Sequence, residues 1–257
     1  MIQNRFKDEQ AKPHMNFAKW EQKLIQEGHF FWPALLLSIA IHQMPFLSVI
    51  HFPLQLLGTY FHEWGHGIAA YLVGGRLEFL EILPNLGGTA YSYYPTDSAS
   101  RAIVPLGGLI GTPLAGAVIL LLTRRLALGR YVLAIVALSF LATALIWAGT
   151  PYTRMICFIG AGLGAALALQ PIRAVHNLTA QIIAIQMMIE TFTSLDYIWI
   201  DGFERQGAWL KSDIAKVADH LWGPRMFWSI AITCLALAII AAAAWFSKPK
   251  PVTGQGA

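Results

Sequence analysis

Three residues with the chemistry of a metal site stand together in TYFHEWGHGIAAYLVGG, residues 59–75, where His62, Glu63 and His66 form the pattern His-Glu-x-x-His. Successive residues of an α-helix turn by about 100°, so His62 and His66 share one helix face. Their imidazoles can hold one Zn²⁺, whose catalytic sites keep a position for water. Glu63 stands beside that position, where a carboxylate acts as the general base during attack on a carbonyl.

The alternative for this segment is that the histidines are hydrogen-bonded core residues, because short patterns also arise by chance. The surrounding residues, however, are mostly apolar and small. Ionisable groups within an apolar membrane span are costly and usually functional. Three of them in metal-binding spacing therefore favour the metal site.

The predicted zinc site needs a third protein ligand, because catalytic zinc sites usually have three. Glu78 and Glu81 follow soon after the motif but lie beyond a Gly-Gly break. The later stretch ETFTSLDYIWIDGFE contains Asp196, within an apolar run, and Asp201, at the end of that run. These two point about 140° apart on a continuous helix. We therefore expect one of them, and not both, to ligate the metal.

The composition of the chain indicates the surroundings of this site. Of 257 residues, 56% are hydrophobic and only 12% are charged, whereas soluble domains have about a quarter charged residues. Lipid is the natural solvent for such a surface. The net charge of +4 is scattered and forms no basic stripe of the kind that binds nucleic acid. We expect an all-α polytopic membrane protein.

Apolar runs of about 20 residues, long enough to cross a bilayer, predict six to seven transmembrane helices. They cover residues 30–50, 52–74, 102–122, 131–149, 152–170, 178–200 and 226–246. We expect one integral membrane metalloprotease-like domain over residues 30–246. A soluble or interfacial segment, residues 1–29, precedes it, and a disordered tail, residues 247–257, follows it.

A short β-hairpin is predicted after the second span. The letters PNLGG indicate a turn, and GTAYSYY alternates small and aromatic residues as a strand does. Such a hairpin must rest on protein or line a wet cavity, because open strands do not face lipid. Glu190 is a further polar residue deep in a predicted span, which either pairs with an arginine or faces the cavity of the site.

The motifs HEWGHG, PNLGG, PLGGLIGTPLAG, LDYIWIDG and KSDIAKVA follow one another over roughly residues 55–225. In this order they resemble the site-2-protease class of intramembrane zinc metalloproteases, most closely its small bacterial and plant members. The resemblance implies that His62 and His66 are zinc ligands and Glu63 is the general base. The late aspartate of the family commonly lies in Leu-Asp-Gly, to which Ile200-Asp201-Gly202 is the nearest match, while Leu195-Asp196 matches only the first half.

The activity that this resemblance implies is cleavage of peptide bonds in membrane-spanning substrates, by a multi-pass protein of the bacterial inner membrane in contact with the lipid bilayer. The strand GTAYSYY is expected to pair with an unwound substrate segment. We expect Asn85, Gly87 and Gly88, in the turn of the hairpin, to bind substrate. The oligomeric state stays open.

Two other functions compete with this prediction. One is an inactive relative that binds or chaperones membrane helices, but such a protein has no chemical need for Glu63. The other is a metal-binding transporter, which would show inverted repeats or broken helices in two halves. No internal repeat is evident in the sequence, so this function ranks last.

Overall fold

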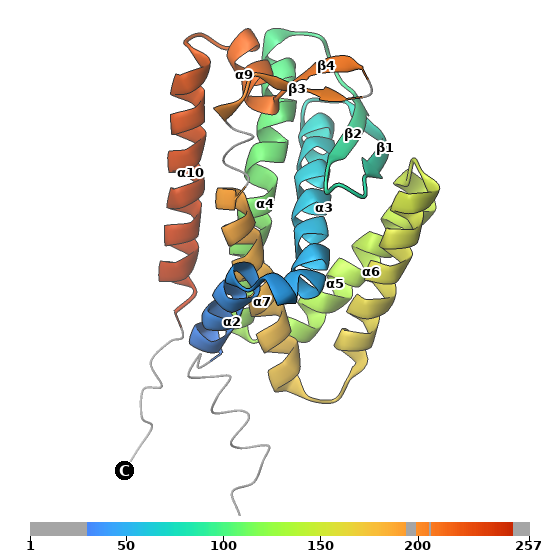
Figure 1. Ribbon diagram of the computed structural model, residues 1–257, viewed down its shortest axis with the longest axis vertical. Coiled ribbons are helices and arrows are strands. Elements are labelled where there is room, and N and C mark those ends of the chain that lie inside the picture. The colour runs from blue at the N-terminus through green and yellow to red at the C-terminus, as the bar shows by residue number, and fades with distance from the viewer. Residues whose placement is uncertain (1–29, 194–198, 206, 249–257) are drawn as a thin grey trace, which may run out of the picture.

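The computed structural model describes residues 30–193, 199–205 and 207–248. Within these ranges the chain is a bundle of helices with two small β-hairpins over one end (Figure 1). The predicted N-terminal segment, residues 1–29, lies outside the described residues, as do Asp196 and all but the first two residues of the predicted tail.

The helices are α2 (Phe31–Gln43), α3 (Ser48–Leu72), α4 (Ser98–Leu126), α5 (Gly129–Ala142), α6 (Pro151–Leu169), α7 (Arg173–Thr193), α9 (Asp213–His220) and α10 (Arg225–Phe246), with a 3-10 turn η1 (Pro45–Leu47) and a π-helical turn η2 (Thr143–Trp147). The strands are β1 (Arg76–Ile82), β2 (Gly88–Tyr93), β3 (Gly202–Arg205) and β4 (Ala208–Lys211). The mostly helical architecture and the hairpin after the metal-motif helix confirm those two predictions.

Four of the described helices are long and apolar enough to cross a membrane: α4, α5 with η2, α6 and α10. The predicted count of six to seven spans also includes α3 and α7. These helices have 25 and 21 residues, but they carry more polar side chains than the four candidate spans. The first predicted span, residues 30–50, differs from the structure. Its helix α2 has only 13 residues, or about 20 Å, and the chain turns at η1 before α3 begins at Ser48.

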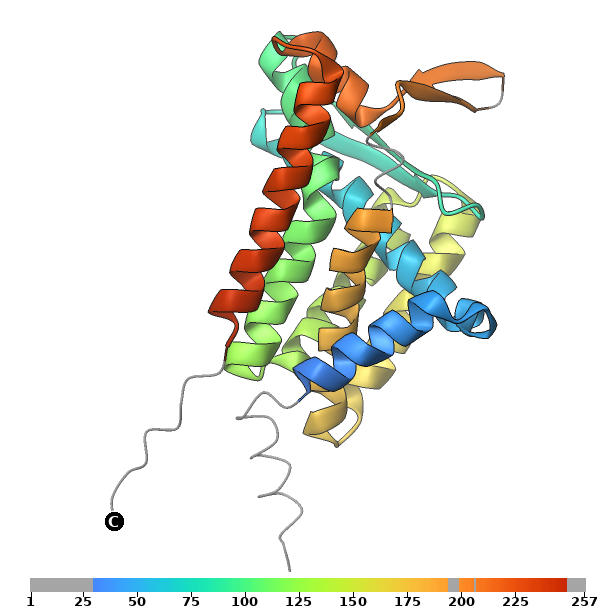
Figure 2. The ribbon, with the colours of Figure 1, turned by 60° about the vertical axis from the view of Figure 1, so that its left-hand side comes forward.

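The sixth predicted span, residues 178–200, is also different. Helix α7 begins earlier, at Arg173, and ends at Thr193. Residues 202–205 are then strand β3, which pairs antiparallel with β4. This second hairpin and the short helix α9 after it were not predicted. Figure 2 shows the hairpin projecting from the end of the bundle beside α9.

Helices α3 and α4 approach each other closely because small residues line their contact. A Cβ atom on Gly65 would lie 2.2 Å from the carbonyl oxygen of Gly107, and one on Gly107 would lie 2.3 Å from the Cβ of Ala69. Side chains larger than hydrogen at these two glycines would force the backbones apart. The small residues thus bring α4 against the face of α3 that carries the histidines, as small residues do between membrane helices generally.

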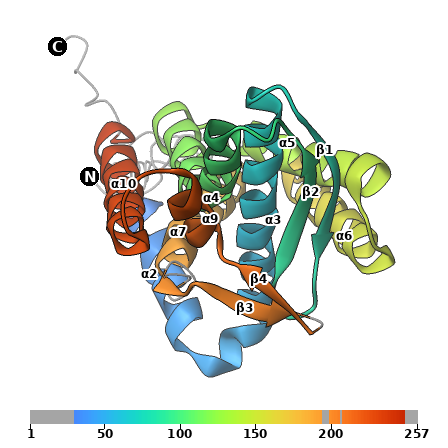
Figure 3. The same cartoon turned by 90° about the horizontal axis from the view of Figure 1, so that it is seen from above.

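The hairpin β1–β2 is held to the bundle along one edge. Leu80 of β1 forms a bridge with Ala148, and its carbonyl accepts the Gly149 amide at 3.0 Å. The Ile82 amide donates to the Thr153 hydroxyl at 2.9 Å. These contacts lie on the edge of β1 that faces away from β2. The opposite edge of this two-stranded sheet is therefore formed by β2. Seen from above, the hairpin β1–β2 lies alongside α3 and the hairpin β3–β4 crosses in front of it (Figure 3).

Candidate metal centre

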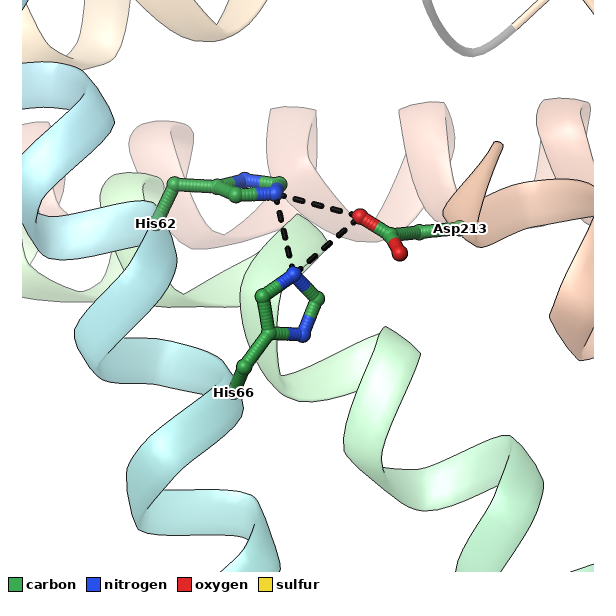
Figure 4. A group of neighbouring side chains, drawn as sticks. All are labelled: His62, His66 and Asp213. Atoms are coloured by element: carbon green, nitrogen blue, oxygen red, sulfur yellow. Dashed lines mark hydrogen bonds and ion pairs between the residues drawn. The ribbon is translucent and has the colours of Figure 1, made fainter. Parts of the chain in front are cut away.

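Three side chains from two distant segments meet at the end of the bundle that carries the two hairpins. His62 and His66 come from α3, and Asp213 is the first residue of α9 (Figure 4). The Oδ2 atom of Asp213 lies 3.2 Å from the Nε2 atom of each histidine, and the two Nε2 atoms are also 3.2 Å apart. The side chain of Asp213 is only 4% exposed, against 11% for His66 and 25% for His62.

This triangle has the size of a zinc ligand set. Zinc lies about 2.0–2.2 Å from imidazole nitrogen and carboxylate oxygen, so two ligand atoms of a tetrahedral site are about 3.3–3.6 Å apart. The observed separations of 3.2 Å are close to this value. Two imidazoles and one carboxylate leave a fourth position open, as catalytic zinc sites do.

The ring of His66 is oriented for ligation by helix α4. Its Nδ1 lies 2.8 Å from the backbone carbonyl oxygen of Val104. Because that oxygen can only accept, Nδ1 is the donor in this contact, and Nε2 is the ring atom that faces Asp213 and that would bind a metal after losing its own proton. Gly108 makes room for the ring, since a Cβ there would lie 2.2 Å from the His66 Cε1 atom.

Asp213 reaches the histidines because α9 packs across α4 and α10. Ile214 is fully buried against Leu109 of α4 and Ile232 of α10. Ser212 caps the helix by accepting the Ala215 amide through its hydroxyl. A carboxylate in the first turn is further favoured by the helix dipole.

The charge environment keeps Asp213 ionised. Burial alone would raise the pKa of its carboxyl, but the imidazole of His66, the hydrogen bonds to both histidines and the Lys216 ammonium outweigh burial and hold the pKa well below its usual range. Lys216 donates to the Oδ1 atom at 3.0 Å. This bond leaves Oδ2 to face the imidazoles. Burial lowers the pKa of Lys216, yet Asp213 outweighs it and raises the pKa, so the lysine stays cationic.

The structure does not place Asp201 with the histidines, and the expectation that it approaches them is wrong for this structure. Its side chain is 75% exposed and forms an ion pair with Arg225. The physical reason is that α7 does not continue to residue 201, as the prediction assumed. The backbone carbonyl of Asp201 instead accepts the Ser212 amide at 3.0 Å, which supports the start of α9. Asp196 lies outside the described residues.

Asp213 lies in the sequence motif KSDIAKVA, but the sequence does not predict it as a metal ligand. The signal for its local structure is present, because Ser212 and Asp213 precede an apolar pattern in the manner of a helix start. Nothing in that local pattern shows that the helix folds over a site 150 residues earlier in the chain.

Glu63 is next to His62 and is 4% exposed. Its carboxylate lies against the start of β2, where a Cβ on Gly88 would be 2.5 Å from the Glu63 Oε1 atom. A larger residue at this position would push the Glu63 side chain out of its place beside the strand. The sequence-predicted trio of His62, Glu63 and His66 therefore does lie together in the fold.

A cavity of about 770 Å³ opens onto these residues. Its wall includes the three residues of the histidine motif, Asp213, strand β2 and parts of α4, α7 and the second hairpin. Asn85, Gly87 and Gly88 all line this cavity. The Gly87 amide donates to the Asn85 side-chain oxygen at 3.2 Å, which stabilises the turn between β1 and β2.

Fold and site together define a helical membrane protein with a candidate metal centre inside one end of its bundle. Residues 33–243 match the family model described as Peptidase M50B-like. The chain therefore belongs to this peptidase family, which is the site-2-protease family, and it is an integral membrane protein. Searches of curated proteins and of solved structures each found no match.

Proposed function

We propose that this protein is an intramembrane zinc metalloendopeptidase that cleaves membrane-spanning substrates, in the inner membrane of a bacterium. The observation that carries the proposal is the convergence of His62, His66 and Asp213 within a ligand-sized triangle beside the buried Glu63. Membership of a peptidase family supports the reaction class. The proposal assigns the third metal ligand to Asp213.

Each residue of the centre has a separate task. His62, His66 and Asp213 would hold the ion through Nε2, Nε2 and Oδ2. Zinc bound there would supply a Lewis acid and lower the pKa of a water molecule. Glu63 takes the proton of the attacking water and passes it to the departing amine nitrogen. Lys216 holds the Asp213 carboxylate in place.

Strand β2 is suited to hold the substrate. A membrane helix must unwind before its peptide bonds can be attacked, and its freed backbone groups then need partners. One edge of β1 is already occupied by the segment around Ala148, whereas β2 lines the cavity. An extended substrate segment that adds to the edge of β2 would pass next to Glu63 and the turn residues Asn85 and Gly87.

The test is Glu63→Gln, which keeps the size of the side chain and removes the base. We expect cleavage of a co-expressed membrane substrate to be lost, while zinc content stays at the wild-type level. The matched control is Glu78→Gln, because Glu78 is 45% exposed and pairs with Arg76 on the surface. Normal cleavage by the Glu63→Gln protein would refute the mechanism. A wild-type protein that binds zinc and cleaves nothing would favour the inactive-relative alternative.

A further inference from the structure

A second, smaller cavity of about 340 Å³ opens at the end of strand β2 that is far from Glu63. Its wall is formed by the end of β2 with the residues just after it, by the start of α4 and by α9. Ser92, Tyr94 and Lys216 line both this cavity and the larger one that contains the metal centre. The smaller cavity therefore continues the larger one along β2.

Basic and hydroxyl-bearing side chains make up the wall of the smaller cavity, which we call the basic pocket. Arg101 comes from the start of α4, and Lys216 and His220, four residues apart, share one face of α9. The other described residues of the wall all carry hydroxyl groups, and no acidic side chain is among the described residues there. The Ser92 hydroxyl is buried and has no hydrogen-bond partner among the described residues. Cations with hydroxyl donors suit an anionic ligand.

The acidic side chains nearest in sequence to this pocket are engaged elsewhere. Asp97, before α4, accepts the Ser100 amide at 2.9 Å and the Ser100 hydroxyl at 2.7 Å. Asp219 of α9 pairs with Lys211 at 2.6 Å. Within the part of the chain that the structure describes, no carboxylate forms an ion pair with Arg101. The pocket thus keeps a positive charge that the described chain does not neutralise.

The position of the basic pocket relative to the metal centre follows from strand geometry. Ser92 and Tyr94 follow Gly88, the residue beside Glu63, by four and six residues. Paired strands advance together by about 3.3 Å per residue. A substrate segment on the edge of β2 would therefore reach the basic pocket about four to six residues, or about 13–20 Å, from the bond that is cut.

We propose that the basic pocket is a substrate subsite that receives an Asp or Glu side chain about four to six residues from the scissile bond, with Arg101 as its specificity-determining residue. This proposal rests on the proposed function, since it uses the same strand and an adjoining cavity. Arg101 lies near the start of α4, a candidate membrane span, and charged residues are tolerated near the ends of such spans. The substrate class is then a membrane-spanning segment with an acidic residue near one end.

A phosphate group of a lipid would also match the charge of the pocket. The wall that the basic pocket shares with the metal cavity, through Ser92, Tyr94 and Lys216, favours the substrate instead. A segment bound along β2 enters the basic pocket without leaving the cavity wall. The ion pair then selects among substrates, because an uncharged side chain cannot replace the carboxylate.

The test measures binding, so that it does not depend on cleavage. The protein carries Glu63→Gln in phosphatidylcholine nanodiscs, and the probes are apolar peptides of about 20 residues with short polar ends. A single Glu is moved through successive positions, each matched by the same peptide with Gln. We expect the Glu peptide to bind at least about tenfold more tightly at one position, which equals about 1.4 kcal/mol. Adding Arg101→Gln should reduce this ratio to about twofold or less, and adding Arg101→Glu should make Lys the preferred residue there.

The matched control is Arg125→Gln, which removes the same charge from the exposed opposite end of α4; it should keep the Glu preference. An unchanged ratio in the Arg101→Gln protein, or no position at which Glu is preferred, overturns the proposal. If no peptide shows a Glu preference and Arg101→Gln loses co-purified phosphatidylglycerol, the pocket binds a lipid phosphate and the proposal is wrong. Zinc-dependent cleavage by the wild-type protein is measured separately. Its absence refutes the proposed function, whereas cleavage without a Glu preference refutes only the subsite.

Discussion

The contact between Gly108 and His66 offers a sharp test of how α4 prepares the metal centre. In Gly108→Ala the new Cβ would lie 2.2 Å from His66 Cε1 and 2.3 Å from Nε2. Ordinary contact begins near 3.4 Å, so the ring must retreat by about 1.2 Å, the difference between 3.4 and 2.2. Alternatively, α4 must move away from α3.

Either movement damages the ligand set. A shift of this size exceeds the roughly 0.2 Å tolerance of a metal–ligand bond, and it strains the 2.8 Å hydrogen bond from His66 Nδ1 to the Val104 carbonyl. Loss of partners that orient a ligand typically costs 10- to 100-fold in metal affinity. We expect the zinc affinity of Gly108→Ala to fall by about 100-fold.

The assay is competition for zinc against a chromophoric chelator in detergent. Gly162→Ala is the matched control, since it makes the same chemical change on α6, where no atom lies within 4 Å of the new Cβ. Its zinc affinity should equal that of the wild-type protein. Wild-type zinc affinity in the Gly108→Ala protein would refute the reasoning that this glycine makes room for the ligating ring.

Two further predictions separate the general base from the metal ligands. In Gly88→Ala the new Cβ would lie 2.5 Å from Glu63 Oε1 and displace the general base. Cleavage should therefore fall by about 100-fold or more, while zinc content is retained. Loss of zinc in this variant would contradict the separate roles of the base and the metal ligands. Lys216→Met removes the cation that holds Asp213 Oδ1 at 3.0 Å and should weaken zinc affinity about tenfold, with a smaller loss for Lys216→Arg. Lys211→Met is its control because Lys211 pairs with Asp219 instead, and equal zinc loss in both Met variants would argue against a specific role for Lys216.

The parts of this protein that were predictable depend on short-range geometry. His62, Glu63 and His66 lie within one turn and a half of a helix, so their spacing alone indicates that the histidines share a face. The hairpin β1–β2 was predictable for a similar reason, because its turn letters and the alternation in GTAYSYY are local signals.

The identity of the third metal ligand, an aspartate, depends instead on tertiary contacts. A helix that continues through the apolar run to residue 200 would carry Asp201 toward the site. The described part of α7 instead ends at Thr193, and Asp201 directly precedes the hairpin β3–β4. Asp213 reaches the site only because buried Ile214 docks α9 against α4 and α10. The packing of Ile214 with Leu109 of α4 joins segments about 100 residues apart, which no local pattern encodes.

The first predicted span failed for a related reason. Residues 30–50 are apolar enough to suggest one helix, but α2 ends at Gln43 and the 3-10 turn η1 starts at Pro45. A proline disfavours helical backbone in the residue before it. The remaining apolar residues after the turn belong to the start of α3, so hydropathy alone joined two separate helices.

Zinc content in two aspartate variants tests the central assignment most directly. Asp213→Asn should purify with far less than one zinc per chain, because it removes the anionic ligand that lies 3.2 Å from both imidazoles. Asp201→Asn should retain zinc at the wild-type level, since Asp201 is exposed and paired with Arg225. Full zinc occupancy in Asp213→Asn, or loss of zinc in Asp201→Asn, would contradict this account of the metal centre.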